Sequence, residues 1–489
     1  MLFNSEIFLF IFLPIVLTGF YLIRMFKLRL ELPFLAASSL IFYSWNEPRW
    51  LILIMFSITA NYFISHWIYK NSSKYKLFFG VLFNVLLIGW FKYRYFVVST
   101  FMDYISFSEL IIPLAISFFT FQQISLLVDV YDRSAKPFSF LDHLFYVTFF
   151  PQLIAGPIVF AREMIPQMKA IKNKKFKFTS LNLFSLGLFV FFIGLFKKVF
   201  LADNIAPYVN FGFKEAIDSL TFIEAWALIS SFALQLYFDF SGYSEMAVGL
   251  ALLFGFRLPF NFNMPYKASS MIDFWKRWHI TVTRFFMLYL YSPISLYLGR
   301  IFIFNNSSNV IFLLLLPILI TFAVSGLWHG ADWKFVYFGL INGVAIIINH
   351  LWNIFKFPKL PFLLGWLLTM MTVLISFVFF RAASTEQAIE MVSVMFNPTL
   401  IILPTWMNTV AELTGLGITN LVFFGTGTFT LRFIIILITL FILSLKIPNV
   451  ADKDYKLKTN WYSASIVSIL ILASFSNLNN AVSFIYFQF

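Results

Sequence analysis

Apolar runs of about 20 residues recur from one end of the chain to the other, and each is long enough to cross a bilayer as an α-helix. Of the 489 residues, 60% are hydrophobic and 12% are charged, whereas about one quarter of the residues in soluble proteins are charged. A transmembrane barrel would instead show short segments of alternating hydrophobicity. The sequence therefore predicts an all-α polytopic membrane protein, whose main surroundings are the lipid bilayer.

We expect about 11–13 transmembrane helices, because several of the apolar runs are short or broken. Neither a repeat nor a low-complexity linker divides the chain, so we expect a single membrane domain over residues 1–489. The candidate spans are 5–23, 32–45, 50–69, 77–99, 108–130, 180–201, 222–240, 243–256, 309–327, 334–351, 362–380, 431–446 and 460–478.

The net charge of +13 does not indicate a nucleic-acid partner. The basic residues gather in short segments beside the apolar runs, which is typical of cytoplasmic loops in membrane proteins. The most basic of these, 162–177, is expected to be a cytoplasmic loop. The direction in which some spans cross the membrane stays open, because it is not settled by the basic residues beside them, Lys92, Arg94, Lys197 and Lys198. Cysteine is absent, which excludes disulfides and thiolate nucleophiles.

Two segments are predicted to interrupt the helical pattern. Pro151, Gly156 and Pro157 lie close together and would break a helix. Because irregular backbone at membrane depth occurs only inside protein or along a wet cavity, we expect a re-entrant hairpin over about 141–161, with a kinked helix as the alternative. The second segment, Phe274–Phe286, mixes aromatic and basic residues and is expected to form an interfacial or partly re-entrant helix.

One of the five histidines, His329, lies between two apolar runs in the segment Ser325–Trp333. Polar side chains at membrane depth tend to face a cavity, a partner or a substrate. An uncharged imidazole can take a proton from an attacking hydroxyl, so His329 is a candidate general base. The flanking Gly326 and Gly330 would let backbone or ligand come close. The alternative is a structural histidine that is hydrogen-bonded across two helices.

His279 is a second candidate. If the segment around it is helical, His279 and Thr283 share a face, and Lys276, Arg277 and Arg284 add positive charge nearby. These residues could hold an anionic donor at the membrane edge, with His279 pointing into the site. The alternative is that the basic side chains and the neighbouring tryptophans only anchor the segment at the membrane surface.

Two acids, Asp239 and Glu245, interrupt a long apolar stretch. Acids inside a membrane often mark ion pathways, but they also pair with basic side chains and hold helices together. We favour the second interpretation, with Arg284 or Arg257 as the partner.

Several nucleotide and metal motifs are absent from the sequence: the P-loop, the dinucleotide-binding glycine motif and the His-Glu-x-x-His zinc signature. We therefore expect no bound metal and no resident cofactor. Without an ATP site, chemistry would have to run on an activated substrate or a gradient.

Four ordered motifs resemble the bacterial membrane-bound O-acyltransferases, among them the branch that acetylates alginate and peptidoglycan. The motifs are Pro151–Pro157, Tyr237–Ser244, Phe274–His279 and Leu327–Ala331, within a core of about residues 110–350. The resemblance implies a ring of helices, with re-entrant segments, around a central tunnel that crosses the bilayer. It also implies that His329 is the essential catalytic residue and that His279 lines the same tunnel.

The resemblance further implies that acetyl-CoA in the cytoplasm donates an acetyl group to hydroxyls of a periplasmic or cell-surface polysaccharide, such as peptidoglycan or an alginate-like exopolysaccharide. The enzyme would lie in the bacterial inner membrane and would work with a periplasmic or membrane-anchored partner protein. His329 would be the base, and His279 would position the donor thioester or assist proton transfer. The residues expected to bind donor or substrate are Lys276, Arg277, Trp278, Arg284, Trp328, Asp239 and Ser241.

One stretch departs from the family. Relatives usually read Asp-Tyr-Leu-Tyr-Ile-Pro-Leu-Gly-Gly after the Arg-Trp-His motif, whereas this chain has Leu288–Ser295 without the acid and the paired glycines. The departure concerns the acceptor and the partner more than the reaction. From the sequence, two other functions stay open: a transporter with Asp239 and Glu245 as coupling groups, and a non-catalytic scaffold of a polysaccharide secretion or modification complex.

Overall fold

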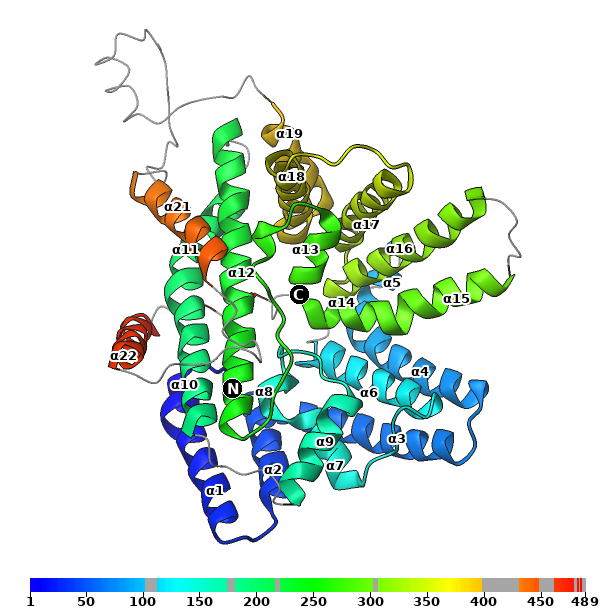
Figure 1. Cartoon of the computed structure of the whole chain (residues 1–489), viewed down its shortest axis with the longest axis vertical. Helices are drawn as coiled ribbons and strands as arrows, with labels where there is room; N and C mark the ends of the chain where they lie inside the picture. Colours follow the sequence, from blue (N-terminus) through cyan, green and yellow to red (C-terminus); the bar gives the residue numbers. More distant parts are fainter. Residues whose placement is uncertain are drawn as a thin grey trace.

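The computed structural model consists, in the part of the chain that it describes, of helices and the segments between them (Figure 1). It describes residues 1–489 with the exception of 102–111, 174–180, 216–219, 302–306, 398–430, 448–460, 479–481, 483 and 486–489. The expected all-α class is confirmed for the described residues.

The N-terminal part is a succession of helices joined by short connections. They are the π-helix η1 (Ile7–Phe12), α1 (Leu13–Met25), α2 (Glu31–Ser44), α3 (Trp50–Lys70), α4 (Lys74–Ile88), the π-helix η2 (Gly89–Tyr93), α5 (Arg94–Phe101) and α6 (Ile116–Tyr131). The span expected at 77–99 is the continuous run from α4 through η2 into α5. Of the span expected at 108–130, residues 108–111 lie outside the described part.

Three short helices follow: α7 (Phe140–Thr148), α8 (Phe150–Leu153) and α9 (Ala161–Lys172). The backbone break predicted for 141–161 is confirmed, since α7 and α8 are separate and residues 154–160 are not helical. The expectation of a loop at 162–177 is wrong up to Lys172, where α9 buries Met164 and Met168 on one face; residues 174–177 lie outside the described part.

The next elements are α10 (Leu181–Phe196), the π-helix η3 (Lys197–Ala202), α11 (Asp203–Glu215) and α12 (Phe222–Leu253). The expected spans 222–240 and 243–256 are wrong as separate elements, because α12 is one helix of 32 residues. From Ser231 to Leu253 every residue of α12 is buried, and a helix buried on all sides lies in the interior. Figure 1 shows α12 in the middle of the molecule.

Glycines let α10 and α12 approach at backbone distance. A β-carbon added to Gly242 would lie 2.6 Å from the carbonyl oxygen of Gly194, and one added to Gly187 would lie 3.0 Å from the carbonyl oxygen of Gly249. Small residues at such positions are a common means of close helix packing in membranes. The two helices therefore form one tightly packed pair.

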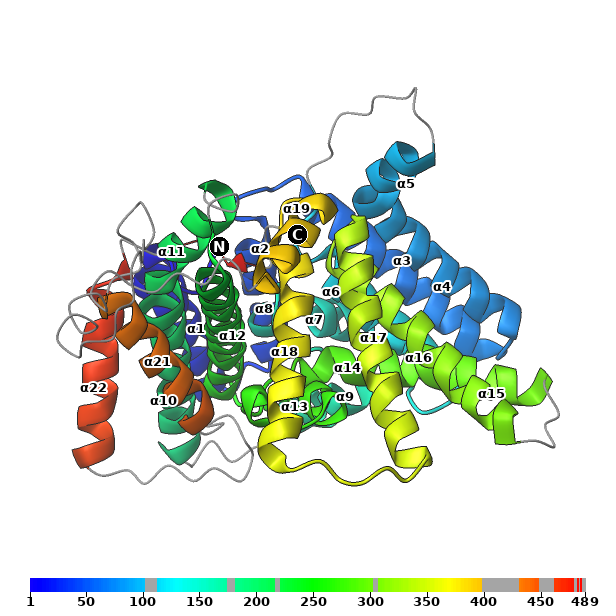
Figure 2. The ribbon, with the colours of Figure 1, turned by 90° about the horizontal axis from the view of Figure 1, so that it is seen from above.

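The remaining described elements follow α12 in the sequence. They are the 3₁₀ turn η5 (Pro265–Lys267), α13 (Met271–Arg277), α14 (Ile280–Phe286), the π-helix η6 (Met287–Tyr291), α15 (Ser292–Ile301), α16 (Ser307–His329), α17 (Trp333–Ile354), α18 (Phe362–Arg381), α19 (Thr385–Met395), α21 (Leu431–Lys446) and α22 (Trp461–Phe475). In Figure 2, α10, α12, α18 and α22 run in similar directions, whereas α3, α4 and α16 are tilted.

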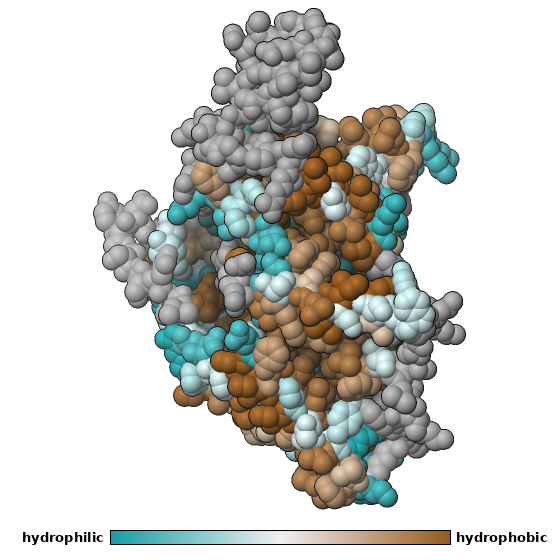
Figure 3. All heavy atoms as spheres, turned by 90° about the vertical axis from the view of Figure 1, so that its left-hand side faces the viewer, coloured by the Kyte–Doolittle hydropathy of each residue, from teal (hydrophilic) through white to brown (hydrophobic). Residues whose placement is uncertain are grey.

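By length and composition, six of the described helices could cross a bilayer, and four shorter apolar helices accompany them. The chain is thus a multi-pass membrane protein, while the larger number of 11–13 spans stays a prediction. Many large apolar side chains point outward, among them Phe10 and Ile15 on the N-terminal helices and Leu472 on α22. Figure 3 shows wide apolar areas on the face that carries α10 and α22, as expected for a surface in contact with lipid.

The C-terminal segment returns to the interior (Figure 1). The ring of Phe484 stacks on Tyr243 at 4.6 Å and lies edge-on to Phe240 at 5.7 Å. The backbone amide of Ile485 donates a hydrogen bond to Asp239 Oδ2 at 2.9 Å. The last described residues are therefore part of the core around α12.

Candidate active site

His329 is the last residue of α16, and a buried lysine fixes the end of that helix. Lys92 Nζ, from η2, donates to the carbonyl oxygens of Trp328 at 2.6 Å and His329 at 3.2 Å. The hydroxyl of Tyr93 donates to the carbonyl oxygen of Leu327 at 2.9 Å. The last carbonyls of a helix lack partners within it, and a cation there also offsets the negative end of the helix dipole. The position of the His329 backbone thus depends on η2.

The His329 ring is enclosed by aromatic side chains. Its centroid lies 4.7 Å from that of Trp328, 5.3 Å from Phe380 and 5.5 Å from Phe338. The prediction that Gly326 lets another segment of backbone come close is confirmed. A β-carbon there would overlap the carbonyl oxygen of Phe335 on α17. The imidazole therefore sits where α16 and α17 meet, with 5% of the residue exposed.

His279 occupies a corner between α13 and α14, so the prediction of one continuous helix over Phe274–Phe286 is wrong. Its φ of 41° and ψ of 52° are left-handed, a region that histidine adopts more readily than most residues. Asn261 holds this corner: its carbonyl oxygen accepts from the Ile280 amide at 2.9 Å. Its side-chain Oδ1 accepts from the hydroxyl of Thr281 at 2.6 Å and lies 3.4 Å from His279 Nδ1.

Trp328 connects the two histidines. Its ring centroid lies 4.7 Å from that of His329 and 6.1 Å from that of His279. Phe121 stacks on the indole at 5.3 Å. The structure thus brings together three residues that the sequence singled out from motifs about 50 residues apart, and all three are buried.

The predicted basic cluster is divided between different partners. Arg277 pairs with Asp273 at 2.9 Å, and Arg284 pairs with Glu163 of α9 through both nitrogens, at 2.5 and 3.0 Å. Lys276 is exposed, and no carboxylate of the described residues pairs with it. Trp278, also expected to bind substrate, is packed in the core, where it stacks on Phe274 at 5.6 Å and meets Phe377 at 5.4 Å.

Asp239 and Glu245 are held in buried ion pairs, but the expected partners Arg284 and Arg257 are wrong. Lys198 Nζ lies 2.7 Å from Asp239 and 2.6 Å from Asp203, and Lys197 Nζ lies 2.6 Å from Glu245. Both lysines come from η3. This geometry agrees with the interpretation that Asp239 and Glu245 hold helices together.

Ser241 is buried one turn from this cluster. With Glu245 and Asn261 it lines a cavity of about 10 Å³, close to the smallest volume that holds a water molecule. Its hydroxyl has no hydrogen-bond partner among the described residues.

Sequence reasoning missed Lys92 and Asn261 as site residues, and it took Lys197 and Lys198 for loop charges. The available signal was that these lysines interrupt helical apolar runs, as Asp239 and Glu245 do. Charges at such positions tend to pair inside the protein.

Comparison with known proteins identifies the class. The pattern of the membrane-bound O-acyltransferase family matches residues 50–382, a range that contains all four motifs. The chain is 37% identical to the peptidoglycan O-acetyltransferase of Helicobacter pylori over 435 residues. The matched region covers 81% of this chain and 80% of the relative. It is 33% identical over 412 residues to the probable alginate O-acetylase AlgI of Azotobacter vinelandii, with 81% and 78% covered.

A more distant similarity, 24% identity over 245 residues, relates 49% of the chain to 57% of the teichoic acid D-alanyltransferase of Streptococcus thermophilus. The chain therefore belongs to the membrane-bound O-acyltransferase family. It is an enzyme, an O-acyltransferase, rather than a transporter or a non-catalytic scaffold.

Proposed function

We propose that the enzyme transfers acetyl groups from acetyl-CoA in the cytoplasm to hydroxyls of a polysaccharide outside the inner membrane, with peptidoglycan as the first acceptor to test and an alginate-like polymer as the second. The names of the relatives support the acetyl group and both acceptors. The observation that carries the proposal is the buried arrangement of His279, Trp328 and His329, because acyl transfer needs a base and the exclusion of water.

In the proposed reaction, His329 accepts the proton of the acceptor hydroxyl. The hydroxyl oxygen forms a bond to the carbonyl carbon of the acetyl group. The carbon–sulfur bond of the thioester breaks, and the thiolate of CoA leaves and takes up a proton. His279 orients the thioester or delivers that proton. Trp328 Nε1 is buried and has no hydrogen-bond partner among the described residues, so it is suited to donate to the carbonyl oxygen as negative charge develops there.

The path of the reactants is part of the same proposal. Donor and acceptor would meet in a tunnel within a ring of helices, and a periplasmic or membrane-anchored partner would present the acceptor or carry the acetyl group onward. The role of Lys276, Arg277 and Arg284 in binding the phosphates of CoA also stays a proposal. The paired carboxylates already neutralise much of the positive charge of the two arginines.

The test combines a deletion strain with two matched variants. O-acetyl groups on peptidoglycan and on secreted polysaccharide are quantified by mass spectrometry in strains that express no protein, the wild type, His329→Ala or His66→Ala. His66 is exposed on α3 and bonds to Tyr62 of the same helix, so it controls for the loss of an imidazole. We expect deletion to remove the acetyl groups from one polymer, and His66→Ala to restore them.

His329→Ala should lower acetyl transfer by about 10²–10⁴-fold, the usual contribution of a general base, at wild-type membrane levels of the protein. Unchanged acetylation of both polymers in the deletion strain would refute the acceptor class. Full restoration by His329→Ala would refute the catalytic role of His329.

A further inference from the structure

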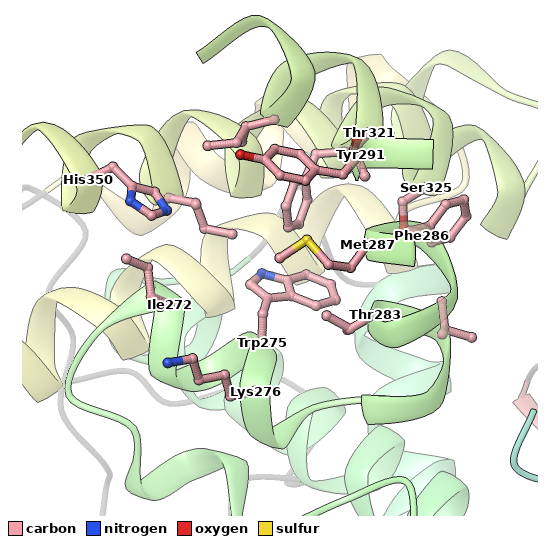
Figure 4. A pocket seen from close by; sticks show the side chains of 14 residues that line it. Ile272, Trp275, Lys276, Thr283, Phe286, Met287, Tyr291, Thr321, Ser325 and His350 are labelled. Carbon is pink, nitrogen blue, oxygen red and sulfur yellow. The ribbon is translucent and has the colours of Figure 1, made fainter. Parts of the chain in front are cut away.

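A cavity of about 210 Å³ lies between α13, α14, η6, α16 and α17 (Figure 4). Its walls are mostly apolar, formed by side chains such as Ile272, Val282, Ile318 and Phe322. Phe286 also lines it, and the ring of Phe286 lies 6.2 Å from that of Trp328. The cavity is thus separated from the candidate active site by one layer of side chains.

Several polar groups of this cavity lie toward its ends, and those of Trp275 and Tyr291 lie between them (Figure 4). Lys276 and His350 lie at one end, and Thr321 and Ser325 lie at the other. Thr321 is 93% buried, since 7% of it is exposed, and its hydroxyl has no hydrogen-bond partner among the described residues. A threonine in a helix often bonds to the carbonyl four residues earlier. Because a buried hydroxyl without a partner is unfavourable, this one is suited to a ligand.

The surroundings of the cavity are those of a lipid-facing surface. Met287, which lines it, is 52% exposed. Ile320 and Val324, on the same helix as Thr321, also point apolar side chains outward. A molecule that enters here comes from the hydrocarbon region of the bilayer, with its polar part near the exposed Lys276.

We propose that this cavity binds an anionic phospholipid, with one acyl chain between α14 and α16 and the phosphate against Lys276 and His350. Apolar walls favour an alkyl chain, and the ammonium of Lys276 favours a negative headgroup over a zwitterionic one. The hydroxyl of Thr321 donates to an ester carbonyl oxygen of the lipid. The proposal rests on the cavity and not on the chemistry at His329, and it assigns Lys276 to a lipid phosphate in place of the phosphates of CoA.

The test uses the full-length protein in phosphatidylcholine vesicles that contain a trace of photoreactive lipid, with the reactive group on the acyl chain and either a phosphatidylglycerol or a phosphatidylcholine headgroup. After irradiation, labelled residues are mapped by mass spectrometry. We expect labels on α14, η6 and α16. Phosphatidylglycerol should label about fivefold more strongly, because one basic side chain contributes about that factor in affinity for anionic lipid.

Two pairs of variants sharpen the result. Lys276→Gln should abolish the headgroup preference, whereas Lys267→Gln, a nearby exposed lysine outside the cavity, should keep it. Ile318→Trp should fill the cavity and remove the label, whereas Ile320→Trp, on the outer face of the same helix, should not. Equal labelling in all four variants would overturn the proposal. Displacement of the label by acetyl-CoA would overturn it as well, since it would assign the cavity to the acyl donor.

Discussion

At the scale of single residues, Lys92 supports the backbone at His329. Its ammonium is buried and donates to the last two carbonyls of α16, so the end of the helix and the imidazole attached to it share one support. A buried carbonyl that loses its partner costs about 1–3 kcal/mol.

We therefore predict that Lys92→Met, which keeps the length of the side chain but removes the ammonium, lowers both thermal stability and acetyl transfer. Lys70→Met, at the exposed end of α3, is the matched control and should change neither. Thermal unfolding followed by size-exclusion chromatography in detergent and the acetylation assay provide the two measurements. Wild-type values for Lys92→Met would contradict the support that we assign to this residue.

The sequence indicated the two histidines as candidates because each lies in a polar motif between apolar runs. The structure places both rings near Trp328, while their catalytic role stays a prediction. The surroundings of the histidines could not be predicted. The left-handed corner at His279 depends on Asn261, 18 residues earlier, and the end of α16 depends on Lys92, 237 residues before His329. Local patterns carry no information about such contacts, since a lysine in an apolar run looks the same whether it faces a loop or a helix terminus.

At the scale of elements, the contact of α10 with α12 depends on the absence of side chains at the glycines. A β-carbon at Gly242 would meet backbone atoms at 2.6 and 2.9 Å, and backbone cannot move aside as a flexible side chain can. The helices would have to separate.

Gly242→Ala should therefore destabilise the protein and lower the amount recovered from membranes. The control is Gly299→Ala on α15, where an added β-carbon meets nothing within 4 Å. Alanine there should be neutral or stabilise by up to about 1 kcal/mol, because it favours the helix. The amount of folded protein after heating distinguishes the two, and equal retention would show that the helices tolerate a wider separation.

The apolar runs predicted most of the elements, but their boundaries failed where charges lie inside them. Asp239 and Glu245 made α12 look like two spans, because an acid ordinarily ends a span. Lys198 and Lys197, more than 40 residues earlier, pair with these acids and allow one helix to continue. A break in an apolar run thus indicates either a loop or a buried partner, and the run alone does not distinguish them.

At the scale of the whole molecule, the ion pairs around Lys198 connect three distant parts of the chain. Asp239 from α12 and Asp203 from α11 bind the lysine, and the same two acids accept hydrogen bonds from Ile485 and Val482. Without Asp239, Lys198 keeps its pair with Asp203, but the buried amide of Ile485 loses its acceptor, which costs about 1–3 kcal/mol.

Asp239→Ala should therefore release the C-terminal segment, and amide hydrogen exchange at Ile485 should become faster. Asp142→Ala removes an acid whose partner Lys172 is half exposed, so exchange at Ile485 should stay at the wild-type rate. Hydrogen-exchange mass spectrometry in detergent measures both variants. An unchanged rate in Asp239→Ala would show that other contacts hold the segment.

The positions of Phe484 and Ile485, which are buried, and of Val482, which is half-buried, also bear on the order of biosynthesis. The ribosome produces these residues after η3, α11 and α12, yet they bond to acids of α11 and α12. Lys198 can therefore pair with Asp203 and Asp239 before these last residues are made, whereas the contacts of Ile485 with Asp239 and of Phe484 with Tyr243 form later. A nascent chain that ends at α22 would lack the stack of Phe484 on Tyr243 and the edge contact of Phe484 with Phe240.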